Sequence, residues 1–395
     1  MDKLQRLKVL SLTARDAFND NTIKVPFFSQ DITNEDKKAV ISALASPLLT
    51  DGPILRKFEN DFRVFTGSKY TVGVSNATAA LHLSLKALGI GKNDEVLIPD
   101  MTFVATASAV LLTGATPVLV DVNDDDLNIS VKSIENSLTS KTKAVIPVHF
   151  AGRACNMKKI MEIARKNNLR VIEDCAHAIG AKYDGKHVGT FGDAGCFSFY
   201  PTKNITTIEG GMVITKSKTI ADHIRTARNH GITKSLTQRY SHGRPWDYDV
   251  TEPGYNYRLD EIRAALGISQ LKRINILNQM RSKACEYYNS KLKTVKGIKI
   301  PISDKADAYH LYVIRIKNEY GVKRDQLFEK LLKNGIRTSV HYKPLHEFTV
   351  FKKRAKIYDK LDNSKQAYKE IISLPLYTRI SRDIQDKVIA AIAKQ

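Results

Sequence analysis

The chain has 395 residues, of which 43% are hydrophobic and 26% are charged, a balance typical of a globular protein with more than one domain. Lysine and arginine outnumber aspartate and glutamate by 62 to 41, but they are spread along the chain without an arginine-rich tract or zinc-finger spacing. The composition therefore indicates a basic, solvated surface and argues against a nucleic-acid partner.

The chain is expected to be cytoplasmic, with no membrane contact and no disulfide bond. No apolar run approaches the roughly 20 residues that cross a bilayer, and residues 1–20 have no apolar core of the signal-peptide kind. The four cysteines form no CxxC pair, which indicates free thiols in a reducing compartment.

The first elements in chain order are an arm and a helix, followed by an alternation of helices and strands. The helix is predicted over residues 33–46, with Thr33 or Asn34 as its cap. From about residue 70, helices are predicted over residues 78–91, 102–115 and 156–169. Strands are predicted over residues 94–100, 116–122, 142–150, 170–176, 192–200 and 210–215. This order predicts an α/β fold with a mainly parallel sheet covered on both faces.

The pattern changes after about residue 270. We predict a long amphipathic helix over residues 265–294, a strand over 308–316, a helix over 323–336 and a terminal helix from about Ile380. The predicted organisation is therefore an N-terminal arm and helix (1–40), a large domain (41–270) and a smaller C-terminal α+β domain (271–395).

Several chemically useful residues follow the predicted strands, where ligands of parallel sheets bind. Asp174 follows an apolar strand in "RVIEDCAHA", and Lys203 follows another in "GCFSFYPTKN". "SNATAALHL" places small polar residues before a helix, where free N–H groups favour a phosphate. Each has an ordinary alternative: a loop aspartate, a surface lysine and a helix cap. Together, a lysine for a Schiff base, an aspartate for a pyridinium nitrogen and a phosphate cradle indicate pyridoxal 5'-phosphate.

The chain resembles the DegT/DnrJ/EryC1/StrS family of sugar aminotransferases, from "TDGP" at residue 50 to "SLPLY" at residue 373. The resemblance is carried by "SNATAALHLSLKALGIGKNDEVLIPDMTFVATA", "GATPVLVDV", "EDCAHAIGA", "GDAGCFSFYPTKN", "EGG", "GYNYRLDEIRAALGISQL" and "VHYKPLH". It implies the type I fold of pyridoxal-phosphate-dependent transferases, with a large domain built on a mainly parallel sheet flanked by helices.

The resemblance also implies roles for individual residues. Lys203 would be the covalent tether of the cofactor and the proton carrier, and Asp174 the partner of the pyridinium nitrogen. His177 would bind the phenolic oxygen, and Phe103 would stack on the ring. The residues implied to hold the phosphate are Ala77, Thr78, Ser198 and, from the neighbouring subunit of a homodimer with shared active sites, Asn256. Between Lys203 and Glu209 the chain reads "NITTI", where many relatives have smaller residues, which leaves the finer substrate assignment open.

Other candidates remain open between function and structure. His341 and His346 would line the sugar pocket or support the fold, and Trp246 would contact substrate or pack a loop. Arg228 and Arg258 would be structural or would neutralise a phosphate. No His/Cys/Asp spacing of the usual metal-binding kind is found, so no metal is predicted.

The resemblance implies transfer of an amino group from L-glutamate, which leaves as 2-oxoglutarate, to a nucleotide-linked sugar. Its branch is closest to enzymes that aminate C4 of 4-keto-6-deoxyhexoses. The alternatives are a 3-keto sugar nucleotide or an inosose as acceptor. Sugar dehydration is disfavoured because relatives with that activity replace the tether by histidine. A non-catalytic nucleic-acid-binding protein would use the net charge of +21 but would not need the cofactor residues.

Overall fold

The computed structural model describes residues 23–234, 239 and 244–393, so the predicted arm from 1 to 22 lies outside the described residues. A seven-stranded sheet forms the centre, in the spatial order β1-β9-β8-β5-β4-β2-β3. Its strands are β1 (Tyr70–Val74), β2 (Glu95–Pro99), β3 (Thr116–Val120), β4 (Thr142–Val145), β5 (Arg170–Asp174), β8 (Ala194–Ser198) and β9 (Gly211–Thr215). β9 is antiparallel to both of its neighbours and the other pairs are parallel, which confirms the mainly parallel sheet.

Helices cover both faces of this sheet because consecutive strand residues point to opposite sides. Ile98 of β2 belongs to a hydrophobic cluster on one face, to which α4 (Ala77–Ala87), α5 (Val104–Leu112) and α8 (Lys218–Ala227) also contribute. Its neighbour Leu97 packs on the other face with α6 (Val131–Asn136) and α7 (Met157–Lys166). Toward β8 and β9 that face is covered by α3 (Pro53–Thr66) and α10 (Glu261–Leu271). α2 (Asn34–Leu44) packs on α10, and Thr33 is its cap, as one of the two predicted alternatives has it.

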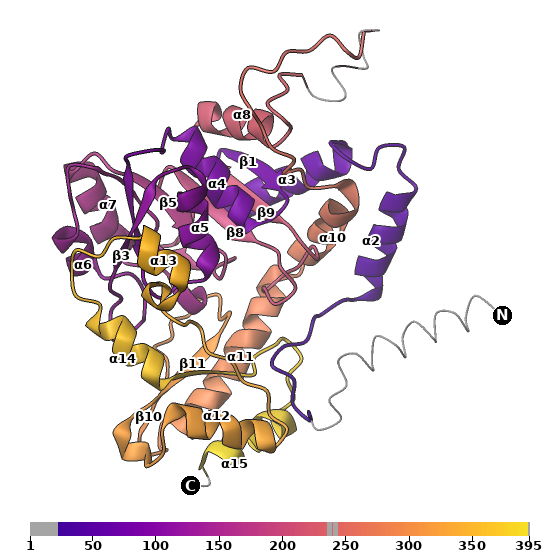
Figure 1. Ribbon diagram of the computed structural model, residues 1–395. Helices are drawn as coiled ribbons and strands as arrows, with labels where there is room; N and C mark the ends of the chain where they lie inside the picture. The colour runs from indigo at the N-terminus through magenta and orange to yellow at the C-terminus, as the bar shows by residue number, and fades with distance from the viewer. Residues whose placement is uncertain (1–22, 235–238, 240–243, 394–395) are drawn as a thin grey trace.

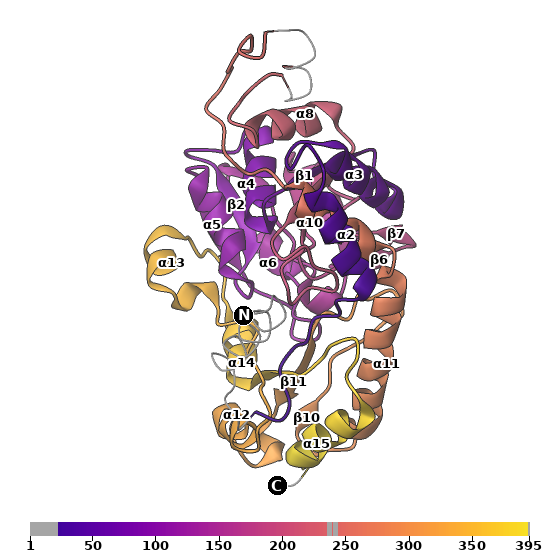
Figure 2. The same cartoon turned by 90° about the vertical axis from the view of Figure 1, so that its right-hand side faces the viewer.

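The C-terminal part has its own sheet and core. Its sheet is β10 (Ile298–Lys299), β11 (Tyr312–Ile316) and β12 (Ile371–Leu374), all antiparallel. α11 (Ile274–Leu292), α12 (Arg324–Lys333) and α15 (Arg382–Ala393) enclose a separate hydrophobic cluster with this sheet. Figures 1 and 2 show these elements at the end of the molecule opposite α8, with α11 running between the two parts. The predicted domain bounds stay a prediction.

The remaining elements are short connections. They include the hairpin β6 (Lys182–Tyr183) and β7 (Lys186–His187), the helices α13 (Thr349–Arg354) and α14 (Asp362–Glu370), and the 3-10 helices η1 (Phe150–Gly152), η2 (Asn318–Tyr320) and η3 (Leu345–Glu347). No helix of the described ranges combines the length and apolar character that a membrane span requires.

Three predicted elements differ from the structure. The helix predicted over 265–294 is two helices, because the chain breaks at Arg273. The Arg273 guanidinium binds Asp31, which precedes α2, at 3.0 Å and Asp36, in the first turn of α2, at 2.9 Å. The strand predicted over 142–150 ends at Val145. The strand predicted over 308–316 begins only at Tyr312, because the preceding backbone bonds to residues 151 and 152 instead.

Candidate active site

A cavity of about 550 Å³ lies at the carboxyl ends of the parallel strands. Predicted site residues that line it are Ala77, Thr78, Phe103, Asp174, His177, Ser198, Lys203 and His341. They come from the start of α4, the start of α5, the ends of β5 and β8, and the segment before α13. The fold therefore brings together residues that are more than 250 positions apart in the chain.

Lys203 lies in the cavity wall in the turn that follows β8, with its amide bonded to the Tyr200 carbonyl at 2.9 Å. No described residue forms a hydrogen bond with its Nζ. Loss of hydration lowers the pKa of the amine to about 8, while the negative charge of Asp174 acts in the opposite direction. A lysine in this environment is partly unprotonated near neutral pH and can act as a nucleophile or a base.

Asp174 ends β5 and is 5% exposed. Its Oδ2 accepts a hydrogen bond from Thr106 Oγ1 at 2.9 Å, and its Oδ1 accepts one from the Ala176 amide at 3.1 Å. Burial raises the pKa of this carboxyl, and its two hydrogen bonds and the charge of Lys203 oppose that rise. A buried carboxylate of this kind is costly without a cationic partner, and a pyridinium nitrogen would supply one.

The start of α4 forms the phosphate side of the cavity. Asn76 caps the helix, and its Oδ1 accepts the Ala79 amide at 2.8 Å. The amides of Ala77 and Thr78 have no acceptor within the helix because they belong to its first turn. Ser198 lies beside them in the same cavity. Free amides and hydroxyls at a helix start favour an anion such as a phosphate.

His177 is buried, and its Nε2 lies 2.9 Å from Tyr342 Oη. Its Nδ1 is also buried and has no partner among the described residues. Burial lowers the pKa of His177 well below its usual range and raises that of Tyr342, so both are neutral near pH 7. If Tyr342 donates to Nε2, the Nδ1 proton remains as a donor without an acceptor. Phe103, 55% exposed, lies 6.0 Å from the Tyr342 ring.

These side chains fit pyridoxal phosphate by their chemistry. The lysine amine matches the aldehyde of the cofactor, and the buried carboxylate matches its ring nitrogen. The unpartnered buried imidazole nitrogen matches the phenolic oxygen, the aromatic ring matches the ring face, and the helix start matches the phosphate.

Other predicted site residues lie elsewhere. His346 is bound to Asp100, with its Nδ1 2.7 Å from Oδ2 and its amide 3.0 Å from Oδ1. Trp246 is 72% exposed, and Asn256 is exposed and does not line the cavity. The structure thus leaves their predicted roles untested.

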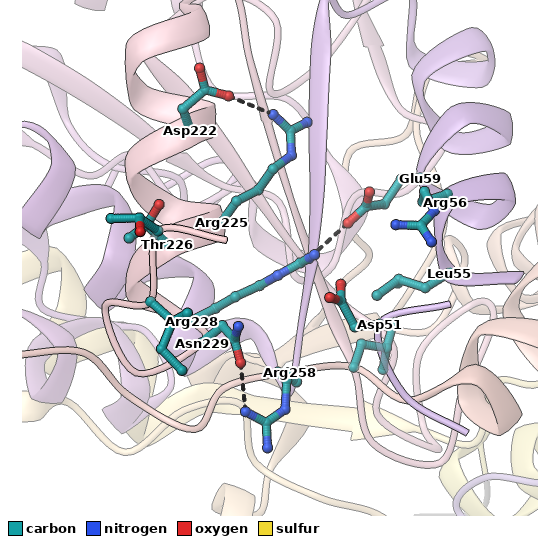
Figure 3. Close-up of a pocket in the computed structure, with 13 residues that line it drawn as sticks. Asp51, Leu55, Arg56, Glu59, Asp222, Arg225, Thr226, Arg228, Asn229 and Arg258 are labelled. Atoms are coloured by element: carbon teal, nitrogen blue, oxygen red, sulfur yellow. Dashed lines mark hydrogen bonds and ion pairs between the residues drawn. The ribbon is translucent and has the colours of Figure 1, made fainter. Parts of the chain in front are cut away.

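A second pocket of about 520 Å³ contains the arginines that the sequence left open (Figure 3). Arg228 is buried, and its Nη1 lies 2.7 Å from Glu59 and donates to the Gly73 carbonyl. Arg258 donates to Asn229 Oδ1 at 2.7 Å. Arg228 therefore supports β1, the strand that leads to α4.

A buried cluster was missed because its members are not regularly spaced in the sequence. His149, Glu173 and Cys175 place ligand-type atoms within 4.8 Å of one another. Glu173 bonds His149 Nε2 at 3.0 Å and accepts the amides of residues 189, 191 and 192. Burial raises the pKa of the Cys175 thiol well above its usual range. The cluster thus fastens the end of β5 to the loop before β8.

The sequence also did not single out Thr106 and Tyr342 as site residues. Both lie in motifs that carry the family resemblance, "MTFVATA" and "VHYKPLH", which is the signal that could have identified them.

Comparison with known proteins gives consistent matches over nearly the whole chain. The family described as the DegT/DnrJ/EryC1/StrS aminotransferase family matches residues 30–393. SpsC of Bacillus subtilis, a spore coat polysaccharide biosynthesis protein, is 39% identical over 374 residues, which are 93% of this chain and 96% of SpsC. The uncharacterized protein MJ1066 of Methanocaldococcus jannaschii is 42% identical over 375 residues, covering 94% of this chain and 97% of its own.

Solved structures agree with these matches. PseC of Helicobacter pylori, an aminotransferase involved in the biosynthesis of pseudoaminic acid, superposes with a TM-score of 0.87 at 30% identity, over 94% of this chain and 98% of PseC. The candidate sugar aminotransferase Spr1654 of Streptococcus pneumoniae superposes in its PLP-form with a TM-score of 0.86 at 30% identity, over 93% of this chain and 97% of its own. The PMP-form of Spr1654 superposes with a TM-score of 0.87 at 30% identity, over 94% of this chain and 98% of its own.

Proposed function

The chain belongs to the DegT/DnrJ/EryC1/StrS aminotransferase family, and we propose that it transfers an amino group from L-glutamate to a nucleotide-linked 4-keto-6-deoxyhexose. It is a sugar aminotransferase with pyridoxal phosphate as its cofactor. The observation that carries the proposal is that Lys203, Asp174 and the start of α4 face one cavity.

Each cavity residue has a proposed role toward the cofactor. Lys203 is the covalent tether, Asp174 binds the ring nitrogen, His177 Nδ1 donates to the phenolic oxygen, and Phe103 stacks on the ring. The phosphate is held by Ala77, Thr78 and Ser198. When bound, the cofactor accepts the electrons released as the α-proton of the amino acid leaves.

Lys203 Nζ is the group that moves the proton. Its lowered pKa, about 8, leaves about one tenth of the amine unprotonated at pH 7, so it can take the α-proton of glutamate. In the second half of the reaction it returns a proton to the sugar carbon that receives the amine. Asp174 stays ionised opposite the ring nitrogen, and Tyr342 holds the His177 tautomer that donates through Nδ1.

The sugar assignment rests on the family resemblance and on relatives that act in sugar pathways. The net charge of +21 suits a substrate with a diphosphate. His341, which lines the cavity, is a proposed substrate residue. His346 and Trp246 remain proposed substrate residues outside the cavity of this chain.

The active sites of a homodimer are proposed to be shared. Asn256 is proposed to bind the phosphate of the neighbouring subunit, and its exposure outside the cavity of its own chain supports this role. The protein is proposed to be cytoplasmic, where nucleotide sugars and glutamate are available.

The test is a visible absorption spectrum of the purified protein before and after glutamate, with Lys203→Ala beside it. We expect an absorption band of the bound cofactor that glutamate bleaches and that the variant lacks. A protein that stays colourless after incubation with pyridoxal phosphate contradicts the proposal. A panel of 4-keto and 3-keto sugar nucleotides and an inosose, with the amino product identified by mass spectrometry, then tests the acceptor.

A further inference from the structure

The side chain of Asn204, the residue after Lys203, connects the lysine turn to distant elements. Asn204 is buried, and its Nδ2 donates to Asn278 Oδ1 at 2.7 Å and to the Ala308 carbonyl at 2.6 Å. Its Oδ1 lies 3.3 Å from His310 Nδ1. Both ends of the amide are therefore bonded to groups more than 70 positions away in the chain.

Asn278, on α11, extends this connection to the turn that follows His177. Its Nδ2 donates to the Ile179 carbonyl at 3.0 Å. The fit is tight, because a Cβ on Gly180 would lie 2.4 Å from that Nδ2. Asn278 thus touches the two turns that carry Lys203 and His177.

The third branch reaches the segment that leads into β11. The amides of Ala308 and His310 donate to the carbonyls of Gly152 and Ala151, at 2.8 and 2.9 Å, which fixes this segment against the large sheet. A displacement of α11 or of the entry to β11 would therefore be transmitted to the backbone beside Lys203.

We propose that Asn204 and Asn278 form an amide junction that positions Lys203 against the cofactor and couples it to α11 and β11. The inference rests on the proposed role of Lys203 as tether and proton carrier. A lysine has four flexible bonds, so the direction of its amine depends on how firmly its backbone is held. Small misplacements of a reacting group cost large factors in rate, which gives the junction its effect.

The test compares Asn204→Ala and Asn278→Ala with Asn289→Ala in the full-length enzyme loaded with cofactor. Asn289 lies on the same helix and also forms two side-chain hydrogen bonds, to Ser303 at 3.3 Å and from Tyr312 at 2.7 Å, but it does not touch the lysine turn. The measurements are the pH titration of the visible band without substrate, kcat and KM for glutamate, and the melting temperature.

We expect both junction variants to shift the midpoint of the spectral titration and to lower kcat roughly tenfold with little change in KM, because a small misplacement of a reacting group lowers the rate by a large factor. Asn289→Ala should change only the melting temperature. Asn278 is half-buried on a helix, so its alanine variant should fold even where Asn204→Ala does not.

The proposal is overturned if the folded junction variants lose stability while the titration midpoint and kcat stay those of the wild type. The wild-type spectrum separates this result from a failure of the proposed function. If the wild type has no band that glutamate bleaches, the assignment of Lys203 itself is wrong, whatever the variants do.

Discussion

The cofactor cavity and the arginine pocket of Figure 3 have similar volumes, but their polar groups differ in how far they are satisfied by hydrogen bonds. In the cavity, His177 Nδ1 is buried and has no hydrogen-bond partner among the described residues, and the pKa of the Lys203 amine is lowered to about 8. In the arginine pocket, Arg228 has a carboxylate and a carbonyl as partners, and Arg225 has Asp222 at 3.0 Å and the Thr71 carbonyl at 3.1 Å.

The difference separates chemistry from support. The ionisable groups of the cavity have shifted pKa values and can bind or react with a ligand, whereas the arginines of the second pocket stabilise the arrangement around them. Substitutions in the cavity should therefore change activity more than stability, and those in the arginine pocket should do the reverse.

The largest effect is expected for Asp174→Asn. Loss of the carboxylate removes the charge opposite the ring nitrogen, and kcat should fall by on the order of 10² to 10⁴. Because the pKa is raised in the folded protein, stability falls as the pH rises from the ordinary carboxyl value of 3.8 to the raised pKa, and the full cost of burying the ionised carboxyl is present above it. The neutral amide removes this cost, so the cofactor-free variant should melt at or above the wild-type temperature at pH 7. Steady-state kinetics and calorimetry measure both effects.

A lower melting temperature for cofactor-free Asp174→Asn would contradict the comparison, since it would make Asp174 a structural group. The matched control is Thr106→Val, which removes one hydrogen bond to the carboxylate but keeps its charge. Its loss of activity should be much smaller than that of Asp174→Asn.

The pH dependence of cofactor uptake tests Lys203 directly. An amine with a pKa of about 8 is half unprotonated at pH 8, against about one part in 300 for an ordinary lysine at 10.5. The rate at which cofactor-free protein takes up pyridoxal phosphate should rise with pH and level off above about 8. Stopped-flow absorbance between pH 6 and pH 10 measures it.

An uptake rate that still rises steeply toward pH 10 would show an ordinary, hydrated lysine. Because the charge of Asp174 opposes the lowering of this pKa, Asp174→Asn should move the midpoint to lower pH.

Arg228→Ala is the corresponding test in the arginine pocket. The substitution leaves Glu59 and the Gly73 carbonyl without their buried partner, and it should cost about 3 kcal/mol of unfolding free energy. The kcat of the folded variant should change less than about threefold, since Arg228 does not line the cavity. Denaturant titration and kinetics at saturating glutamate give the two numbers.

Arg225→Ala is the matched control because the ion pair of Arg225 with Asp222 is exposed: the Arg225 side chain is 37% exposed and the Asp222 side chain 46%. It should cost less than about 1 kcal/mol. Equal losses of unfolding free energy for Arg228→Ala and Arg225→Ala would show that burial does not determine how much each arginine contributes to stability.

The alternation of helices and strands is strong enough that the sheet and most of its helices could be predicted from the sequence. The break between α10 and α11 could not, because residues 265–294 contain neither proline nor an internal helix-ending glycine. At the break, Arg273 binds Asp31 and Asp36, a contact across more than 230 positions. Such distant pairings are invisible to local patterns.

Most of the candidate cavity residues could be proposed from the sequence because they follow a strand or begin a helix within a recognisable motif, whereas Thr106 and Tyr342, which also line the cavity, were not singled out. The networks behind them could not. The sequence gives no sign that Asn204 bonds Asn278, or that Tyr342 determines which nitrogen of His177 is free. Their partners become neighbours only when α11 and the segment before α13 fold against the large sheet.

The smallest effect is expected at Ile208, in the segment "NITTI" beside Lys203. Ile208 has φ +70°, a conformation that is strained for a β-branched residue, and its side chain is 57% exposed. Ile208→Gly should therefore raise the unfolding free energy by about 1 kcal/mol, the cost of the left-handed conformation offset by the entropy of glycine. Asp51 of the arginine pocket has φ +54°, but aspartate tolerates this conformation. Asp51→Gly should therefore raise the unfolding free energy by less than Ile208→Gly does.

A destabilised Ile208→Gly would mean that the exposed side chain contributes packing that outweighs its strain. If the variant is stabilised and glutamate still bleaches its absorption band, the cavity forms independently of the strained Ile208. The activity of the Ile208→Gly variant toward each sugar acceptor would then be the measurement that tests whether Ile208 has a role in substrate choice.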